Sequence, residues 1–193
     1  MITISGLSKN FDERMLLDNV SISVFANEKI GLTGPNGTGK TTLFSIMLGQ
    51  MEPTAGKVQA QKNLNIGYLA QESSFASDRT VIDEVTSGDA RIQALRQEQH
   101  QMEEQNKAGE MRYGDILQEL EHLGVYDLEH KAEKILAGLG FKEEDIRKPI
   151  NNLSGGWQMR ALLAKLLTYQ YDLLLLDEPT NYLDLHATIW LKD

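Results

Sequence analysis

Apolar and polar residues alternate along the first part of the chain. The alternating apolar positions are Ile2 and Ile4, followed by Val20, Ile22 and Val24. This period of two is typical of strands that bury one face. Residues 29–33 (KIGLT) add a further predicted strand, which runs directly into a glycine-rich loop.

Helical spacing first appears after that loop. Residues 41–48 have the length and composition of a helix that ends near Gly49. Pro53 and Gly56 mark a turn, and Val58 and residues 65–69 indicate two more strands. The first third of the chain therefore predicts a strand–loop–helix core with an antiparallel edge.

The pattern changes near residue 87. Residues 89–134 contain no proline and are rich in Gln, Glu, Leu and Arg, which favour helices. Two apolar stripes at helical spacing run through this part of the chain: Ile116, Leu120 and Leu123, then Ala132, Ile135, Leu136 and Leu139. We interpret residues 87–145 as a helical insert with a hairpin near residues 107–109, between core segments 1–86 and 146–193.

The last part of the chain returns to the core pattern. Ser154 is positioned to cap a helix that buries its leucines: Leu162, Leu163, Leu166 and Leu167. Residues 173–176 are four consecutive leucines, which favours a strand buried on both faces. Alternating strands and helices with a buried strand predict an α/β fold.

Composition narrows the function classes. Of the 193 residues, 41% are hydrophobic, and the net charge is −9, which argues against a protein that coats nucleic acid through a general positive charge. The chain has no cysteine, no secretory signal, and no apolar run near the roughly 20 residues of a membrane helix. We expect a soluble, cytoplasmic protein.

The glycine-rich loop matches G-x-x-x-x-G-K-[ST], placed before a predicted helix. Its residues are Gly34, Pro35, Asn36, Gly37, Thr38, Gly39, Lys40 and Thr41. Such a loop directs backbone N–H groups and a helix N-terminus at phosphate oxygens. Lys40 is expected to reach the β- and γ-phosphates, and the Thr41 hydroxyl is expected to bind Mg²⁺. An accidental glycine-rich turn is the simpler alternative.

Two acids follow the leucine run. Asp177 is the candidate magnesium partner, and Glu178 is positioned to orient or deprotonate an attacking water. Taken alone, such a pair more often ends a strand and caps a turn. The Asn-Lys-x-Asp element that reads guanine is absent from the sequence, so ATP is favoured over GTP.

Three further segments resemble the ABC-type ATPases. Residues 153–158 (LSGGWQ) look like the signature motif, residues 177–184 (DEPTNYLD) resemble the Walker B and D-loop segment, and Gln71 stands at the position of the Q-loop glutamine. The resemblance covers nearly the whole chain. It implies a P-loop NTPase core of ABC-ATPase type with an antiparallel β edge and a helical insert.

The resemblance also implies roles for individual residues. Gln71 would contact Mg²⁺ and the attacking water, and Glu178 would be catalytic. Ser154, Gly155 and Gly156 would bind the γ-phosphate held by another ATPase domain, so that ATP lies between two domains. Phe11 would stack on adenine, although a lone Phe is as often a core residue. The predicted nucleotide site thus comprises Phe11, residues 34–41, Thr42 and residues 154–156, with Thr41, Gln71 and Asp177 at the metal.

Within that superfamily, Trp157, the pair Gln71-Glu72 and residues 179–184 resemble the ABC-F branch. Members of this branch carry two ATPase domains, lack membrane domains, and in several cases act on the ribosome. Because the switch histidine of the family is expected beyond Asp193, we interpret the chain as a truncated first domain that binds ATP with little turnover. Its partners would be a second ATPase domain, as part of one polypeptide or as a homodimer, and the ribosome or RNA.

Two alternatives are kept. The ATPase subunit of a membrane transporter would use the same core, and it predicts a compact helical region with exposed apolar residues around Gln71. An ATP-dependent dimerisation module without catalysis would carry the same motifs. The insert weakens the RNA-binding hypothesis, since residues 89–134 hold 11 acidic and 6 basic residues.

Overall fold

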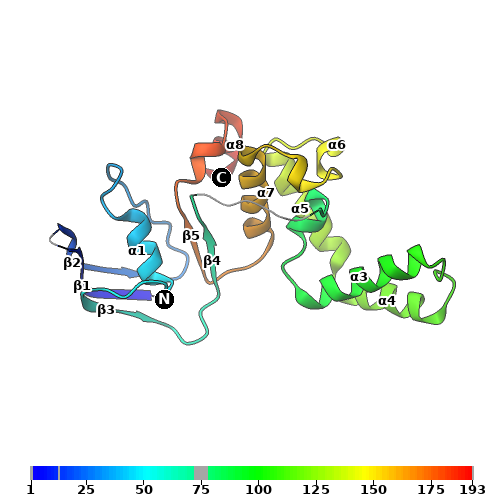
Figure 1. Cartoon of the computed structure of the whole chain (residues 1–193), viewed down its shortest axis with the longest axis horizontal. Coiled ribbons are helices and arrows are strands. Elements are labelled where there is room, and N and C mark those ends of the chain that lie inside the picture. Colours follow the sequence, from blue (N-terminus) through cyan, green and yellow to red (C-terminus); the bar gives the residue numbers. More distant parts are fainter. Residues whose placement is uncertain (1, 13, 72–77, 193) are drawn as a thin grey trace. The chain divides into compact units, whose positions relative to one another are not determined.

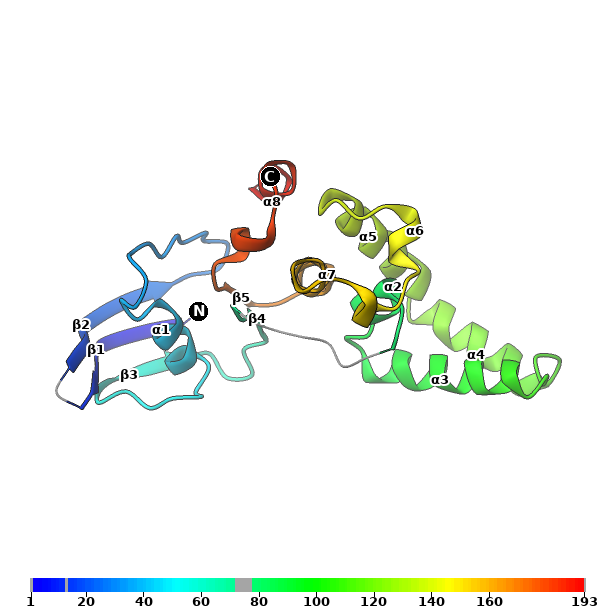
Figure 2. The same ribbon diagram turned by 45° about the horizontal axis from the view of Figure 1, so that its top comes forward.

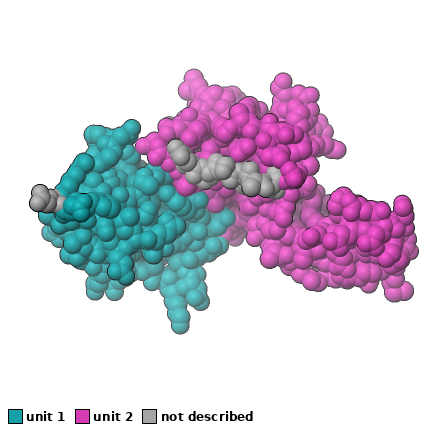
Figure 3. Space-filling view, in the orientation of Figure 1, with its two compact units in different colours: residues 1–68, 171–177 teal, residues 69–170, 178–193 magenta. Residues whose placement is uncertain are grey.

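A computed structural model describes residues 2–12, 14–71 and 78–192 of the chain. These residues form two compact units, coloured teal and magenta in Figure 3. Unit 1 spans residues 1–68 and 171–177, and unit 2 spans residues 69–170 and 178–193. The chain therefore passes from unit 1 to unit 2 between the two acids, Asp177 and Glu178.

Unit 1 is built on a three-stranded antiparallel sheet with the order β2-β1-β3 (Figure 1). The strands are β1 (Ile2–Phe11), β2 (Arg14–Val24) and β3 (Ala55–Ala60). Ile4 and Leu7 of β1 pack with Leu43 and Ile46 of helix α1 (Lys40–Met47). The predicted alternation in the first strand and the antiparallel edge are confirmed, because one face of β1 supplies this core.

A second pair of strands completes unit 1. The strands β4 (Ile66–Leu69) and β5 (Leu173–Leu176) begin side by side, where the backbone N–H of Asp172 donates to the Asn65 carbonyl at 2.9 Å. Only Leu175 of the four leucines is buried. The prediction of a strand buried on both faces was wrong, because a two-stranded pair covers its leucines only in part.

The predicted strand at residues 29–33 is also wrong. Neither sheet includes these residues, and Ile30 and Leu32 are 49% and 42% exposed. A strand needs a neighbour that pairs its N–H and C=O groups. In the described structure β4 and β5 pair with each other, and residues 29–33 have no regular secondary structure and lead into the glycine-rich loop.

Unit 2 is helical. Its elements are α2 (Val81–Val85), α3 (Ala90–Glu104), α4 (Met111–His122), α5 (Val125–Gly138), α6 (Glu143–Ile146), η1 (Ile150–Asn152), α7 (Gly155–Thr168), η2 (Pro179–Tyr182) and α8 (Leu185–Lys192). The unit contains all of the predicted insert, residues 87–145, together with α2, α7 and α8. The insert as a domain of its own stays a prediction.

The helices α3 and α4 lie side by side as a hairpin, as Figures 1 and 2 both show. Their turn includes residues 107–109, so the predicted hairpin is confirmed. The apolar stripe is confirmed at Ile116 and Leu120, which are buried with Ile92 and Leu95 of α3. Leu123 was wrongly included in it. At 43% exposure it follows the end of α4, where the helical register stops.

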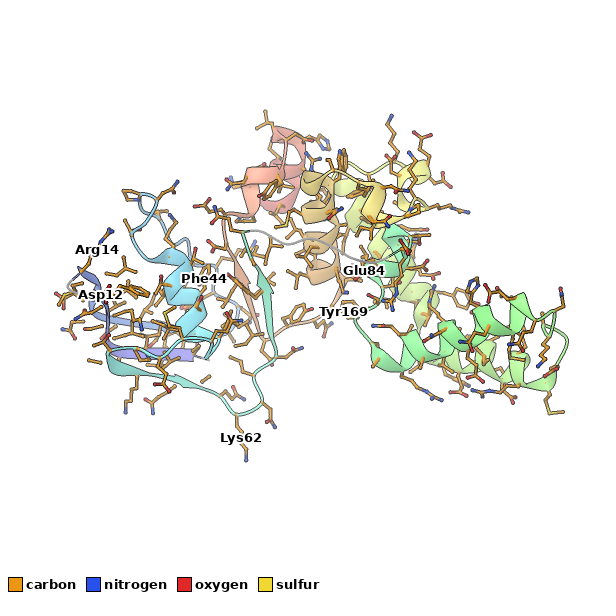
Figure 4. The ribbon with its side chains drawn as sticks, viewed as in Figure 1. Asp12, Arg14, Phe44, Lys62, Glu84 and Tyr169 are labelled. Atoms are coloured by element: carbon orange, nitrogen blue, oxygen red, sulfur yellow. The ribbon has the colours of Figure 1, made fainter. Side chains whose placement is uncertain are left out.

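The rest of unit 2 packs around α7. The second predicted stripe is confirmed by burial, since Ala132, Ile135 and Leu136 of α5 and Leu139, which follows the end of that helix, are all buried. A partly buried ion pair joins α2 to α7, where Lys165 Nζ lies 2.7 Å from Glu84 Oε1. Figure 4 labels Glu84 on α2. The helix α8 docks on α5 through Trp190, whose ring lies so close to Gly138 that a Cβ there would be 2.1 Å from it.

Candidate functional site

The glycine-rich loop of unit 1 is exposed and ends in α1. All residues from Gly34 to Thr38 are exposed, and the helix begins at Lys40. Gly39 caps the helix with a φ of 99°, a left-handed conformation that favours glycine, and a Cβ there would lie 3.0 Å from Leu16. The first N–H groups of an eight-residue helix therefore open onto the loop, which is the arrangement that binds phosphate.

Lys40 crosses the mouth of this loop. Its Nζ donates to the Gly34 carbonyl at 3.0 Å and to the Pro35 carbonyl at 3.2 Å. Within the same loop, the Thr38 hydroxyl donates to the Pro35 carbonyl at 2.9 Å. A Cβ at Gly34 would lie 3.1 Å from Thr38 Oγ1, so a larger residue would fill part of the cradle. The ammonium group of Lys40 thus lies at the opening of the loop, where an anion would enter.

Thr41 and Asp177 meet although they are 136 residues apart. The Thr41 hydroxyl donates to Asp177 Oδ2 at 2.6 Å, and Asp177 is only 3% exposed. Burial raises the pKa of Tyr68, a residue of β4, and the negative charge of Asp177 raises this pKa further. Unit 1 therefore holds a buried carboxylate beside the hydroxyl at the start of α1.

These two oxygens fit the magnesium that such loops use. Mg²⁺ keeps several waters and is bound by one or two protein oxygens together with the phosphates of its nucleotide. Among the described residues, no group of three His, Asp or Glu side chains could hold a metal without further ligands. A hydroxyl and a carboxylate in direct contact are the sparse donor set expected for Mg²⁺ with ATP.

Glu178 lies in unit 2, at the start of turn η2, and its backbone is unusual. Its φ of 50° is left-handed, which is uncommon for a residue other than glycine and is often found at functional sites. Asn181 Nδ2 donates to Glu178 Oε2 at 2.7 Å, and Gln71 Nε2 donates to the same oxygen at 3.4 Å. Two amides thereby hold one carboxylate oxygen in place.

Sequence reasoning assigned no role to Asn181. The predicted site residues Gln71 and Glu178 are brought together, but the shorter of the two bonds to the carboxylate comes from Asn181. Its position three residues after Glu178, in a segment with proline and threonine, is the spacing of a tight turn. Glu72, which completes the predicted Gln-Glu pair, lies outside the described residues.

Ser154 occupies the N-cap position of α7 in unit 2, as predicted, but its side chain does not cap the helix. The structure gives no side-chain capping bond there, while the Ser154 carbonyl accepts from the Gln158 N–H at 3.0 Å. Ser154 and Gly155 are exposed. The start of α7 thus presents a serine hydroxyl beside helix N–H groups, which is suited to an anion.

Phe11 ends β1 in unit 1 and is 45% exposed. Lys9 Nζ lies 5.2 Å from the centre of its ring. This exposure makes a core role a poor explanation of Phe11, and stacking on adenine stays a prediction.

None of the helices in the described ranges combines the length and the hydropathy that a bilayer crossing requires. This finding agrees with the sequence, in which the longest strongly apolar run is four leucines.

The fold and the loop together define a P-loop nucleotide-binding protein, and comparison with known proteins makes the class specific. The family model described as "ABC transporter" matches residues 17–181. Because the match covers most of the chain, the chain belongs to this family, as one of its ATP-binding domains.

Curated relatives agree with this assignment. The chain is 38% identical over 192 residues to the probable ATP-binding protein YheS of Haemophilus influenzae, covering 100% of the chain and 30% of that protein. It is 35% identical over 202 residues to YfmM of Bacillus subtilis, an uncharacterized ABC transporter ATP-binding protein, covering 100% of the chain and 39% of that protein. The chain thus spans 30% and 39% of the lengths of these two relatives.

Solved structures confirm the fold. An ATP-binding subunit of an ABC transporter matches with a TM-score of 0.67 and 16% identity, covering 99% of this chain and 71% of that one. The ATP-binding cassette MJ0796, a dimer in a post-hydrolysis state with ADP and phosphate, matches with a TM-score of 0.64 and 21% identity, covering 99% of this chain and 79% of that one. The predicted α/β fold of ABC-ATPase type is confirmed.

Proposed function

We propose that the chain is an ATP-binding domain of an ABC-F-like ATPase, in which ATP is sandwiched between two such domains and hydrolysed. By itself this chain is proposed to bind ATP with little turnover. The observation that carries this proposal is the 2.6 Å hydrogen bond from Thr41 to the buried Asp177. It joins the glycine-rich loop to the acid that follows the leucine strand, which is the pairing that Mg²⁺ with ATP requires.

The residues divide the work. Bound Mg²⁺ would neutralise phosphate charge during the reaction. The loop amides and Lys40 bind and orient the phosphates, and Thr41 and Asp177 would hold the Mg²⁺ through their side-chain oxygens. Glu178, held by Asn181 and Gln71, accepts a proton from the attacking water.

A second copy of the domain completes the site. Each copy carries a loop that binds the phosphates of one ATP and, at Ser154 with the first amides of α7, an anion site for the γ-phosphate of another. Two copies facing each other would enclose ATP between unlike half-sites. In the longer relatives such a second domain would belong to the same polypeptide, and for this chain alone we propose a homodimer.

The dependence on a second copy gives the first experiment. We expect ATP turnover per chain to be low in dilute solution and to rise with chain concentration, because dimers form by mass action. Glu178→Gln is expected to bind ATP about as tightly, to lower turnover by about 100-fold, and to accumulate as an ATP-dependent dimer. Turnover per chain that is independent of concentration, or that survives Glu178→Gln, would contradict the proposal.

The helical insert, residues 87–145, is proposed as the region that contacts a macromolecular partner, with the α3–α4 hairpin as an arm. The arginines of this hairpin are engaged in ion pairs. Arg112 Nη2 lies 2.7 Å from Glu98 Oε2, and Arg91 and Arg96 pair with Glu119 and Glu129. Since these cations are neutralised within the protein, the hairpin is better suited to a protein surface than to an RNA backbone.

The ribosome in the cytoplasm is the proposed partner, and the membrane subunits of a transporter are the alternative. The Glu178→Gln chain should co-sediment with ribosomes when ATP is present, and Lys40→Ala, which removes the ATP contact, should not. If both variants stay in the supernatant, the ribosome proposal fails and the transporter alternative gains support.

A further inference from the structure

Arg160, in the second turn of α7, is tied to three other segments of unit 2. Its Nε donates to the Tyr182 carbonyl at 2.7 Å, and its Nη1 donates to the Leu139 carbonyl and to Asp184 Oδ2, both at 3.0 Å. Its side chain is only 12% exposed. One guanidinium thus joins α7 to the end of α5 and to both sides of Leu183, the residue that follows η2.

Aromatic rings fix the position of this guanidinium. The centre of the Trp157 ring lies 4.6 Å from Arg160 Cζ, a cation–π distance. The Trp157 ring also packs edge-to-face against Phe141, with the ring centres 4.7 Å apart. Trp157 and Arg160 both lie in the first two turns of α7. The Trp157 ring therefore fixes the arginine side chain at the point from which it reaches across to turn η2.

The turn η2 is the element that needs such a restraint. It starts at Glu178, whose left-handed backbone is unfavourable for a residue with a side chain and persists only where the surroundings fix it. Inside the turn, the Asn181 N–H donates to the Glu178 carbonyl at 3.1 Å, and the Leu183 N–H donates to the Thr180 carbonyl at 3.1 Å. Arg160 binds the C-terminal end of this turn, at the Tyr182 carbonyl.

Asp184 and Tyr182 extend the restraint on each side. Asp184 Oδ1 accepts from the Ala187 N–H at 2.9 Å and so begins α8, while its other oxygen accepts from Arg160. The Ala187 N–H and the Arg160 guanidinium lower the pKa of Asp184, so it is charged at neutral pH. The Tyr182 hydroxyl donates to the Gln71 carbonyl at 3.2 Å, which connects the turn to the segment that carries the second amide on Glu178.

We infer that Arg160 is a positioning residue for Glu178, which it serves by fixing turn η2 to the helix that begins at Ser154. This inference rests on the proposed function, in which Glu178 accepts the proton from water. Arg160 itself does not touch the reacting atoms. It mechanically joins the two functional elements of unit 2, the anion-binding start of α7 and the carboxylate that acts on water.

The test compares Arg160→Ala, Arg160→Lys and Arg147→Ala, where Arg147 is an exposed arginine at the end of α6 in the same unit. ATP hydrolysis is measured at the chain concentration where turnover per wild-type chain is highest. A misplaced catalytic group costs rate and leaves binding intact. We therefore expect Arg160→Ala to lower kcat by at least about tenfold while KM for ATP changes by less than about twofold.

Arg160→Lys separates positioning from charge. Lysine keeps the positive charge but lacks the planar group that serves Tyr182 and Asp184 together, so it should restore only part of kcat. Arg147→Ala should match the wild type. A kcat for Arg160→Ala within about twofold of wild type, or a parallel loss of ATP affinity, would overturn the inference.

A second measurement decides the matter if wild-type turnover proves too low to measure, which would count against the proposed function alone. Hydrogen exchange of the amides of residues 180–187 is compared with that of the α3–α4 hairpin. Arg160→Ala should speed exchange in residues 180–187 by at least about tenfold and leave the hairpin unchanged, with partial recovery in Arg160→Lys. Unchanged exchange in residues 180–187, or equal acceleration in both regions, would overturn the inference.

Discussion

Units 1 and 2 place functional groups in different ways. In unit 1 the glycine-rich loop is exposed, and its shape comes from the backbone, through Gly39 and the start of α1. In unit 2 Glu178 is held by side chains, with amides from Gln71 and Asn181 on one oxygen and Arg160 at the end of the turn. A backbone device is recognisable from a short motif, whereas a side-chain network depends on residues brought together by folding.

This contrast predicts that single substitutions in the loop of unit 1 will act on ATP binding or on the backbone that shapes the loop, and those in unit 2 on stability or turnover. The largest expected effect is that of Lys40→Ala. Removing two charge-assisted hydrogen bonds to phosphate should cost about 4 kcal/mol, or about 1,000-fold in ATP affinity. Titration with a fluorescent ATP analogue measures it, and Lys57→Ala, an exposed lysine on β3 of the same unit, is the control. Equal affinities for the two variants would contradict the contrast.

The next effect concerns the stability of unit 2. Lys165→Ala leaves Glu84, whose side chain is 8% exposed, without its 2.7 Å partner. Removing the lysine leaves a buried carboxylate without this partner and should destabilise unit 2 by about 3 kcal/mol. Chemical denaturation followed by hydrogen exchange of α2 and α7 measures the loss. The double variant Glu84→Ala/Lys165→Ala should be less damaged than the single one, and a purely additive result would show that the pair contributes nothing.

A smaller effect is expected at Gly39. Gly39→Ala places a Cβ on a residue with a φ of 99°, 3.0 Å from Leu16, and should cost about 1–2 kcal/mol in folding or in ATP binding. Gly31 is the matched control, because a Cβ there meets nothing within 4 Å. Thermal unfolding and ATP titration of both variants measure the difference. If Gly31→Ala is as harmful as Gly39→Ala, backbone conformation does not define the loop.

The smallest effect is the acid sensitivity of the α3–α4 hairpin. The hydrogen bond from Arg112 lowers the pKa of Glu98, and Arg91 together with Arg112 lowers that of Glu119. A carboxyl group with a lowered pKa stabilises the folded state above its ordinary pKa of about 4.3, and this contribution is lost as the pH falls through the folded-state pKa. The helicity of the hairpin should therefore decrease below about pH 4.3. Arg112→Gln should reduce this dependence, as followed by hydrogen exchange of α3 and α4, and an unchanged profile would argue against it.

Most of the fold could be predicted from the sequence wherever the pattern within a single element is enough to define that element. The alternation at Ile2 and Ile4, the helix predicted at residues 41–48 and found as α1 (Lys40–Met47), and the hairpin near residues 107–109 are local signals, and all three elements are confirmed. The strand at residues 29–33 failed for the complementary reason. Its apolar pattern is real, but whether a strand forms depends on a neighbour that pairs with it, and local pattern does not contain that information.

The candidate site divides in the same way. The motif residues Lys40, Thr41 and Asp177 were identified because their spacing and flanking elements are fixed by the chemistry of phosphate binding. The contacts of Asn181 with Glu178 and of Arg160 with Tyr182 could not be predicted from the sequence. They depend on the left-handed backbone of Glu178 and on the turn that follows it. Contacts of this kind follow from tertiary structure.

The placement of the aromatic indole rings has a practical consequence. The chain has two tryptophans, Trp157 in α7 and Trp190 in α8, and both belong to unit 2. One stacks on Arg160 and the other packs against Gly138. Selective excitation of tryptophan fluorescence therefore reports on unit 2 alone, at α7 and at the docking of α8. The two tryptophans therefore serve as intrinsic fluorescent probes of unit 2, and unit 1 contributes no tryptophan signal.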